Sequence, residues 1–352
     1  MGIKNLNNLI AEFTNIDPCN KTELSNFRNK TFAIDANLFI YKFLYSNGNH
    51  INGLFFMINK LSKFKINPVF IFDGRPPEEK KHTLDNRKKL KKKIHTQVLT
   101  LKANLLLTND TAKITEVKNK IANLEKRLVY VDNNVIQSSK KLLNLMNILY
   151  IDAPSEAEQL CSILSRLNIV DGVISDDTDT LACGSKIILR NFNNKQDYVS
   201  YYNFTGILYE LGLNYDSFLD LCILLGTDYN SKIKNMNYKS AYKLIKTHKN
   251  IESISENTNY NIYYDYHNIR GIFKNCDIDE SIIQNIKKSK ETVFTSCDLI
   301  KLVKFLEEKS SITKKTFLFR LNKMYKKNRI TTPNKYSCFD STYKINTSCL
   351  TK

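Results

Sequence analysis

The sequence predicts an α/β fold with a mostly parallel central sheet flanked by helices. Short apolar runs rich in β-branched and aromatic residues indicate buried strands at 31–35, 68–73 and 172–177. Segments with helical periodicity separate these runs, and that alternation is typical of a parallel sheet. Each run ends on an aspartate, at the strand end where ligand sites of such sheets lie.

Residues 78–128 form a highly charged insertion with two apolar stripes at helical spacing. Leu90, Ile94, Val98, Leu101 and Leu105 form the first stripe, and Ile114, Val117, Ile121, Leu124 and Leu128 form the second. The TNDT segment at 108–111 predicts a turn between them. We expect a helical hairpin that stands away from the sheet. Two ordinary surface helices that cover the core are the alternative.

The second half of the chain predicts two further strands and then helices. IILRNF at 187–192 and DYVSYY at 197–202 are strand-like, and helical patterns follow at 204–211, 215–225 and 238–248. The loop GTDYNSKIKNMN precedes the last of these helices. Beyond about residue 250 the chain is helical and basic, and from Ile330 it is polar and lacks periodicity, which indicates a loose tail.

Composition points to a polyanionic partner. The 352 residues carry a formal net charge of +18, which favours nucleic acid over a protein that is merely basic. The start MGIKNLNNLI lacks a secretion signal, and no apolar run approaches the ~20 residues of a membrane span. The eight cysteines lie in mostly apolar surroundings, which predicts buried thiols in a reducing, intracellular compartment.

Seven acidic residues form the candidate metal site. They are Asp35, Asp73, Glu156, Glu158, Asp177, Asp179 and Asp228. Taken singly, each has an alternative role as a helix cap or a turn residue. Carboxylates gathered at one sheet edge repel one another unless cations neutralise them, and oxygen ligands select Mg²⁺ or Mn²⁺. Two such ions ~4 Å apart can stabilise the attacking and leaving oxygens in phosphodiester hydrolysis.

Basic residues form two candidate phosphate-binding elements. Eight of the fourteen residues at 80–93 are Lys or Arg, and Lys80 and Arg87 share a helix face two turns apart. This face can neutralise charge on a scissile phosphate, with a solvated basic face as the alternative. The second element is the loop and helix at 228–248, whose helix N-terminus can hold a duplex phosphate. Its lysines are Lys232, Lys234, Lys239 and Lys243.

The motifs, in their order, closely resemble the flap endonuclease family of 5′ structure-specific nucleases, of the Rad2/XPG type. They are MGI, AIDANLFIY, VFIFDGRPP, IDAPSEAEQ, SDDTDTL and ELGLNYDSFLDLCILLGTDY. The resemblance implies a PIN-like nuclease core at 1–255 that includes a helical arch at 78–128 and a helix-turn-helix module at 228–248. A single-stranded 5′ flap would thread through the arch. A basic helical region at 256–328 would pack on the core, and 329–352 would form a polar tail.

The resemblance also implies roles for single residues. Asp35, Asp73, Glu156 and Glu158 would hold one Mg²⁺, and Glu158, Asp177 and Asp179 a second, with Asp228 acting through water and Mn²⁺ able to substitute. Lys80 and Arg87 would contact the scissile phosphate, and with Asp177 and Asp179 they are the candidate catalytic residues. Gly2, exposed by removal of Met1, would lie near the DNA. Tyr41 would stack on a terminal base, with a core tyrosine beside Phe43 as its alternative.

Three departures from the family pattern leave further expectations open. Asn235-Met236-Asn237 replaces a glycine-flanked turn, which leaves K⁺ binding in the helix-turn-helix loop open. The segment SNGNHINGLF is short where many family members have an acidic, threonine-containing loop that helps to hold a displaced 3′ nucleotide. The preference for a double-flap substrate is therefore open. The tail has Tyr336, Phe339 and Tyr343 but no glutamine-led motif with paired aromatics, so sliding-clamp binding is open as well.

The predicted function is therefore a 5′ flap endonuclease, with possible 5′–3′ exonuclease activity, that cleaves branched DNA in replication, repair or recombination. We expect a monomer located in the nucleus, or at a cytoplasmic replication site if the source is viral. A nuclease for bubbles or four-way junctions and an RNA exonuclease are the enzymatic alternatives. A non-catalytic protein that binds DNA junctions is the alternative from another class.

Overall fold

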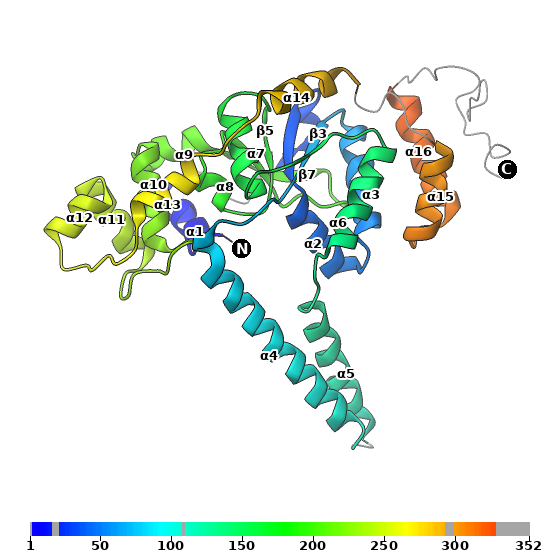
Figure 1. Ribbon diagram of the computed structural model, residues 1–352, viewed down its shortest axis with the longest axis horizontal. Coiled ribbons are helices and arrows are strands. Elements are labelled where there is room, and N and C mark those ends of the chain that lie inside the picture. Colours follow the sequence, from blue (N-terminus) through cyan, green and yellow to red (C-terminus); the bar gives the residue numbers. More distant parts are fainter. Residues whose placement is uncertain (1, 16–20, 108–109, 293–298, 329–352) are drawn as a thin grey trace.

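A seven-stranded mixed sheet lies at the centre of the computed structural model, which describes residues 2–15, 21–107, 110–292 and 299–328 (Figure 1). Its strand order is β1-β7-β6-β5-β2-β3-β4. The strands are β1 (Lys21–Glu23), β2 (Thr31–Asp35), β3 (Asn67–Phe72), β4 (Tyr150–Asp152), β5 (Gly172–Ile174), β6 (Ile187–Arg190) and β7 (Tyr198–Asn203). The run from β6 to β4 is parallel, while β7 is antiparallel to β6 and β1. The α/β class is confirmed.

The central strand β2 shows why these residues form a sheet covered on both faces. All five of its residues are buried, as expected for a parallel strand with helices on each side. Phe32 and Ile34 pack into one apolar cluster, while Ala33 packs into another. The sequence prediction missed β1 and β4, which are short strands at the two edges of the sheet and are less buried than the equally short β5.

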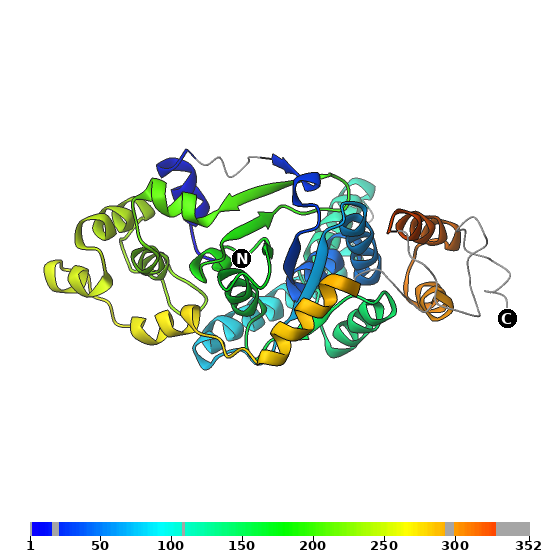
Figure 2. The same ribbon diagram turned by 90° about the horizontal axis from the view of Figure 1, so that it is seen from above.

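Helices cover both faces of the sheet (Figures 1 and 2). The helices α2 (Ala36–Asn47), α3 (His50–Lys63), α6 (Asn133–Leu145), α15 (Leu299–Lys309) and α16 (Lys314–Asn328) contribute to the first cluster. The cluster around Ala33 includes residues of α7 (Ala157–Arg166) and α14 (Glu280–Thr292). A third cluster joins α1 (Leu6–Phe13), α8 (Asp179–Ala182), α9 (Phe204–Leu211), α10 (Tyr215–Leu225), α11 (Tyr238–His248), α12 (Ile251–Asn257) and α13 (Tyr266–Lys274). Within the described residues, no helix is long and apolar enough to cross a membrane.

The charged insertion forms a helical hairpin that projects from the body (Figure 1). Its helices are α4 (Lys81–Leu105) and α5 (Thr111–Lys126), preceded by the short 3₁₀ helix η2 (Glu78–Lys80). Ile94, Val98 and Ile121 are its buried apolar side chains, and Lys102 pairs with Glu125 at 2.7 Å. Leu90 of the expected first stripe is 51% exposed, so that stripe is not buried along its whole length. Part of the expected turn, 108–109, lies outside the described residues.

The C-terminal region is helical as expected. Leu302 and Phe305 of α15 and Phe317 of α16 belong to the large apolar cluster together with residues of α3 and α6. The predicted tail at 329–352 lies outside the described residues, and the division into domains stays a prediction. Cys161, Cys183 and Cys222 are buried, in agreement with their apolar sequence surroundings.

A buried ion cluster joins α10, α12 and α13. The guanidinium of Arg270 donates to both carboxylate oxygens of Asp220 at 2.6 Å and to both of Glu252 at 2.6 and 2.7 Å. The side chain of Asp220 is only 2% exposed, and its Oδ2 also accepts from the backbone N–H of Ile251. Such bidentate pairs fix geometry strongly, so this cluster holds the helical unit that follows the helix-turn-helix loop.

Replacing Arg270 by methionine should lower the free energy of unfolding by about 3–5 kcal/mol, because Asp220 would be left as an uncompensated buried charge. Urea unfolding followed by circular dichroism measures this loss. The double variant Asp220→Asn/Arg270→Met should recover part of it. The control Arg127→Met changes an exposed arginine, and an equal loss in both single variants would contradict the role of the cluster.

Candidate active site

Two neighbouring parallel strands bring the first carboxylates together. Asp35 is the last residue of β2, and its side chain caps α2 by accepting from the Leu38 N–H at 3.0 Å. Asp73 directly follows β3, and its Oδ1 accepts from the Ala157 N–H at 2.9 Å. Because β2 and β3 are paired in parallel, both residues lie at the same edge of the sheet.

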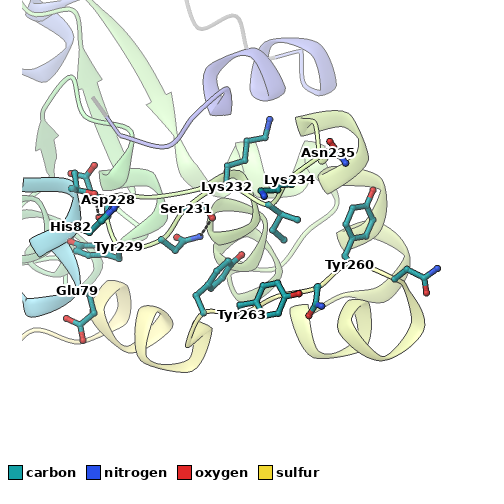
Figure 3. Close-up of a pocket in the computed structure, with 16 residues that line it drawn as sticks. Glu79, His82, Asp228, Tyr229, Ser231, Lys232, Lys234, Asn235, Tyr260 and Tyr263 are labelled. Atoms are coloured by element: carbon teal, nitrogen blue, oxygen red, sulfur yellow. Dashed lines mark hydrogen bonds between the residues drawn. The ribbon is translucent and has the colours of Figure 1, made fainter. Parts of the chain in front are cut away.

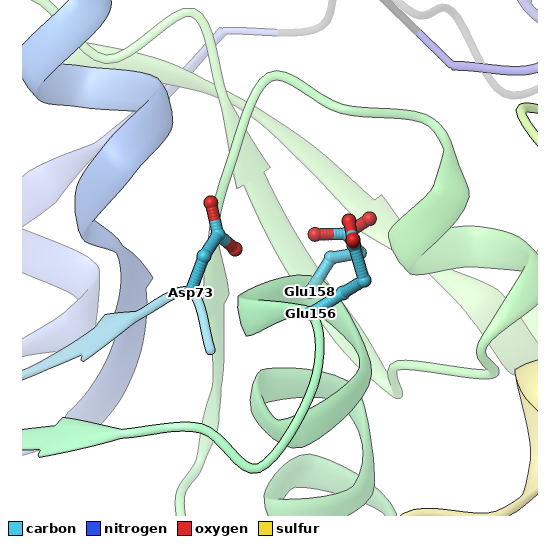
Figure 4. Close-up of side chains that lie close together, drawn as sticks. All are labelled: Asp73, Glu156 and Glu158. Carbon is cyan, nitrogen blue, oxygen red and sulfur yellow. The ribbon is translucent and has the colours of Figure 1, made fainter. Parts of the chain in front are cut away.

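The start of α7 adds two glutamates to this edge. Glu156 is the N-cap position and Glu158 lies in the first turn. One carboxylate oxygen from each of Asp73, Glu156 and Glu158 lies within 4.8 Å of the others (Figure 4). Both glutamates are buried, while Asp73 is exposed, so the group opens to solvent on the Asp73 side.

The β5–α8 connection and the loop after α10 complete the group. Asp177 Oδ1 accepts from the Asp179 N–H at 3.1 Å, and Asp179 is 2% exposed. Asp228 lies in the loop after α10, where its backbone carbonyl accepts from the Thr83 hydroxyl at 2.7 Å. The base of α4 is thereby tied to the loop that carries Asp228.

Electrostatic effects among these residues show that they form one cluster. Burial raises the pKa of Asp35 well above its usual range, and the charges of Asp73 and Asp177 raise it further. Burial likewise raises the pKa of Asp179, with further increases from Asp177 and Asp228. For Glu158, burial raises the pKa despite the opposing charge of Lys80. The crowded carboxylates therefore resist full ionisation unless more positive charge is supplied.

Lys80 and Arg87 supply the positive charge of the cluster. The buried Lys80 ammonium pairs with Glu156, and lies 3.5 Å from Asp228 Oδ2 and 3.9 Å from Glu158 Oε1. Although burial alone would lower the pKa of Lys80, these carboxylates raise it overall. Arg87 Nη2 donates to Asp228 Oδ2 at 2.7 Å. Both side chains contact the carboxylate of Asp228. This agrees with the prediction that Lys80 and Arg87 share one helix face.

The donor set fits divalent cations. All seven acidic candidates are carboxylates, the hard oxygen ligands that Mg²⁺ and Mn²⁺ prefer. Asp179 Oδ1 is buried and has no hydrogen-bond partner, which is costly for a polar atom unless a cation contacts it. The acidic cluster is therefore a plausible metal site, and the assignment of each carboxylate to a particular ion stays a prediction.

Gly2 packs directly against this cluster. Its φ is +95°, and a Cβ there would lie 2.2 Å from both Asp177 Oδ1 and Thr178 Oγ1. The next residue, Ile3, donates its N–H to the Thr178 hydroxyl at 2.8 Å. Only glycine fits such an approach without displacing its neighbours, so the N-terminal segment is held beside the carboxylates.

Tyr41 lies close to the cluster without joining it. It is half-buried on α2 and lines a cavity with Lys42, Tyr45 and Asp176, the residue before Asp177. Its ring stacks on Tyr45 with centroids 6.4 Å apart. Tyr41 is therefore partly accessible beside Asp176, and its role in stacking on a terminal base stays a prediction.

The four lysines of the helix-turn-helix module are exposed and lie apart from the carboxylates. Lys232 and Lys234 belong to the loop, and Lys239 and Lys243 to α11. Lys239 pairs with Glu12 of α1. Asn235 adopts φ +60°, the left-handed conformation that asparagine tolerates better than most residues, and Asn237 caps α11. The turn therefore forms without the glycines of the family pattern.

Several supporting residues were missed by the sequence analysis. The Asn37 side chain accepts from the Asp73 N–H at 3.4 Å, and the Thr83 and Thr178 hydroxyls hold the segments described above. A run of tyrosines at 260–264 faces the 228–235 loop (Figure 3). AIDAN and SDDTDTL contain Asn37 and Thr178, but nothing local in the sequence reveals their long-range partners.

Comparison with known protein families gives two matches. The XPG N-terminal domain matches residues 1–94, and the XPG I-region matches residues 147–228. Together these regions contain all seven carboxylates, Lys80 and Arg87.

Several curated relatives with one shared name align with most of this chain. Flap endonuclease 1 of Enterocytozoon bieneusi is 33% identical over 297 residues, which cover 80% of each chain. The protein of that name from Brugia malayi is 29% identical over 374 residues, covering 100% of this chain and 94% of its own. The Homo sapiens protein is 32% identical over 280 residues, covering 75% and 70%.

Solved structures share the fold. Flap endonuclease-1 from Methanococcus jannaschii is 25% identical, with a TM-score of 0.65 over 90% of this chain and 98% of that one. The catalytic core of Rad2 in complex with a DNA substrate is 23% identical, with a TM-score of 0.63 over 92% and 100%. The resemblance inferred from the sequence motifs is confirmed, and the chain belongs to the flap endonuclease family of structure-specific DNA nucleases.

Proposed function

We propose that this chain is a 5′ flap endonuclease, with 5′–3′ exonuclease activity, that hydrolyses phosphodiesters in branched DNA with two Mg²⁺ ions. One observation carries the proposal: seven carboxylates and the Lys80 ammonium lie at one sheet edge, next to the base of the projecting hairpin of α4 and α5. The nuclease names of the relatives support it. None of these observations favours the non-catalytic junction binder.

The residues divide into two proposed cation-binding groups. Asp35, Asp73, Glu156 and Glu158 form one, and Glu158, Asp177 and Asp179 form the other, with Asp228 acting through water. When bound, the two cations supply Lewis-acid charge to the attacking and leaving oxygens, and Mn²⁺ can substitute for Mg²⁺. The unpartnered Asp179 Oδ1 and the close oxygens of Asp73, Glu156 and Glu158 support both groups.

Lys80 and Arg87 bind and orient the scissile phosphate in this proposal. Both now share the carboxylate of Asp228, so a phosphate at the cluster must compete with that carboxylate for them. Asp228 would hold Lys80 and Arg87 less strongly if cations were bound, because the negative charge that attracts the two side chains would be partly offset. Arg87, 42% exposed, can then turn toward the phosphate and stabilise its developing charge.

The remaining predicted contacts place DNA around this centre. Gly2 and Tyr41 flank the carboxylates, α4 and α5 form the arch over a single-stranded 5′ flap, and Lys232, Lys234, Lys239 and Lys243 hold the duplex backbone. A monomeric state completes the proposal, which includes neither K⁺ in the helix-turn-helix loop nor sliding-clamp binding. The enzyme would act on DNA in the nucleus, or at a cytoplasmic replication site of a virus.

Asp179→Asn should abolish cleavage of a 5′ flap substrate in Mg²⁺ while substrate binding in EDTA persists, because only the cation ligand is removed; Asp177→Asn should do the same. Gel mapping on flaps, nicks, bubbles and four-way junctions measures activity and substrate preference together. The control Asp216→Asn changes an exposed aspartate far from the cluster. Full turnover by both site variants would exclude the two-ion assignment.

Asp179→Asn should also be more stable than the parent chain when both are unfolded in EDTA. A carboxylate whose pKa is raised by burial opposes folding at neutral pH, because its charged form is better hydrated in the unfolded chain. The gain should be about 1.4 kcal/mol for every unit by which the pKa is raised, counted only up to the pH of the measurement. Thermal unfolding measures it, and added Mg²⁺ should stabilise the parent chain more than Asp179→Asn. Equal Mg²⁺ effects on both chains would contradict the proposed ligand.

Arg87→Ala should lower kcat by about 10²–10³-fold while KM changes little, because the lost contact acts mainly on charge in the transition state. Single-turnover cleavage of a flap substrate measures the rate. Lys88→Ala is the matched control, since Lys88 is the next residue on α4 and its side chain is 76% exposed. An equal loss in both variants would indicate a general effect of positive charge instead.

A further inference from the structure

An eighth carboxylate lies at the same edge of the sheet, and its contacts differ from those of the other seven. Asp176 comes directly before Asp177 in the 175–179 segment, which joins β5 to α8. Its Oδ2 accepts from the ammonium of Lys42 at 2.7 Å, and its Oδ1 accepts from the Asn191 N–H at 2.6 Å. Both carboxylate oxygens are thus bonded to other parts of the chain, which makes Asp176 an anchor for the segment that carries Asp177.

Further hydrogen bonds hold this anchor from several sides. The backbone carbonyl of Asp176 accepts from Nη2 of Arg190, the last residue of β6, at 2.7 Å. Arg190 is buried, and its Nη1 donates to Asn7 Oδ1 on α1 at 2.7 Å. Lys42 also donates to the backbone carbonyl of Phe192 at 2.9 Å. The network therefore connects the 175–179 segment to α1, to α2 and to the end of β6.

Lys42 is the residue that α2 contributes to this network, and α2 also positions Asp35. Asp35 caps the helix, and Lys42 follows it by seven residues, which is two helical turns, so both lie on one helix face. The pairing of β2 with β5 ends at Ile34 and Ile174. Beyond that pair, the ion pair of Lys42 with Asp176 joins α2 to the 175–179 segment.

The two sides of this ion pair belong to different proposed cation groups. Asp35 lies in the first group, and Asp177 and Asp179 lie in the second. The groups repel each other, since the charge of Asp177 is among those that raise the pKa of Asp35. Repulsion drives the 175–179 segment away from α2, whereas attraction between Lys42 and Asp176 draws the two together. The ion pair therefore opposes the displacement that would separate the groups.

We propose that Lys42 is a positioning residue for the metal centre: through Asp176 it holds the second proposed cation group at a fixed separation from Asp35. Lys42 then acts within the proposed two-ion function, on which this inference rests, from outside the seven carboxylates. Charge and position have effects of opposite sign. As a charge alone, Lys42 would repel cations, so its removal would tighten their binding. As a positioning residue it favours the geometry that holds them, so its removal weakens their binding.

Calorimetric titration of the full chain with Mn²⁺ alone, without DNA, tests this sign. Lys42→Met should weaken Mn²⁺ binding by about 10-fold, the lower end of the range for groups that hold metal ligands in place. Lys42→Arg should keep most of the affinity, because a guanidinium can also donate to Asp176. Lys30→Met is the matched control and should leave the affinity unchanged. Lys30 pairs with Asp171 at 3.0 Å, where the same two strands, β2 and β5, begin.

Cleavage kinetics separate positioning from DNA binding. Lys42→Met should raise the Mg²⁺ concentration for half-maximal flap cleavage by a similar factor, with KM for DNA at saturating Mg²⁺ unchanged. Unchanged or tighter Mn²⁺ binding by Lys42→Met would overturn the proposal. A raised KM together with unchanged Mn²⁺ affinity would also overturn it, because Lys42 would then contact a DNA phosphate.

Hydrogen exchange in EDTA distinguishes failure of this inference from failure of the proposed function. Backbone N–H groups at 176–180 should exchange faster in Lys42→Met than in the parent chain, because the segment opens more readily. Lys30→Met should not change them. If the parent chain binds no Mn²⁺ and cleaves no flap, the proposed function fails, and faster exchange still supports Lys42 as the residue that positions this segment. Unchanged exchange contradicts that role whether or not the parent chain cleaves.

Discussion

Mutual repulsion among the carboxylates at the end of the parallel strands is the constraint on which the active site depends. The sheet places Asp35 and Asp73 at one edge, and the segments that follow β4 and β5 bring Glu156, Glu158, Asp177 and Asp179 to it. Burial and crowding raise the pKa of several of them, which disfavours their ionised forms. The Lys80 ammonium offsets part of this repulsion from inside the cluster, so the site resembles a partly neutralised cage that divalent cations would complete.

This arrangement also couples the arch to the site. Lys80 ends η2, and Arg87 and Thr83 lie on the first turns of α4. All three contact Asp228, through its carboxylate or its backbone carbonyl. The base of α4 is therefore fixed by the charges it neutralises. The rest of the hairpin has few buried apolar contacts, Ile94, Val98 and Ile121, and elements with so few contacts are the ones that open most readily. A firm base and a loosely packed tip suit the proposed role of the hairpin as an arch over a single-stranded 5′ flap.

The sequence predicted the centre of the site better than its surroundings, for physical reasons. Strand-end aspartates converge in any parallel sheet, so Asp35, Asp73 and Asp177 could be grouped without coordinates. The shared helix face of Lys80 and Arg87 followed in the same way from helical periodicity. The burial of Lys80 among carboxylates, the contact of Gly2 with Asp177 and the unpartnered Asp179 Oδ1 depend on packing between distant segments. Strands β1 and β4 were missed because short strands at the edges of a sheet are only partly buried and lack the apolar run that marked β5.

The distribution of charge explains how DNA, a polyanion, can approach a protein whose candidate active site is acidic. The net charge of the chain is +18. Asp35, Glu156, Glu158 and Asp179 are buried and Asp228 is paired with Lys80 and Arg87, whereas the four lysines of the 228–248 module are exposed. DNA approaching the surface therefore meets positive charge first, which favours association over a range of about 8–10 Å at physiological salt. At closer range the carboxylates would repel the scissile phosphate unless cations stood between them. In the proposed function, such a site would exclude productive contact with the phosphate until cations were bound, because the carboxylates would otherwise repel it.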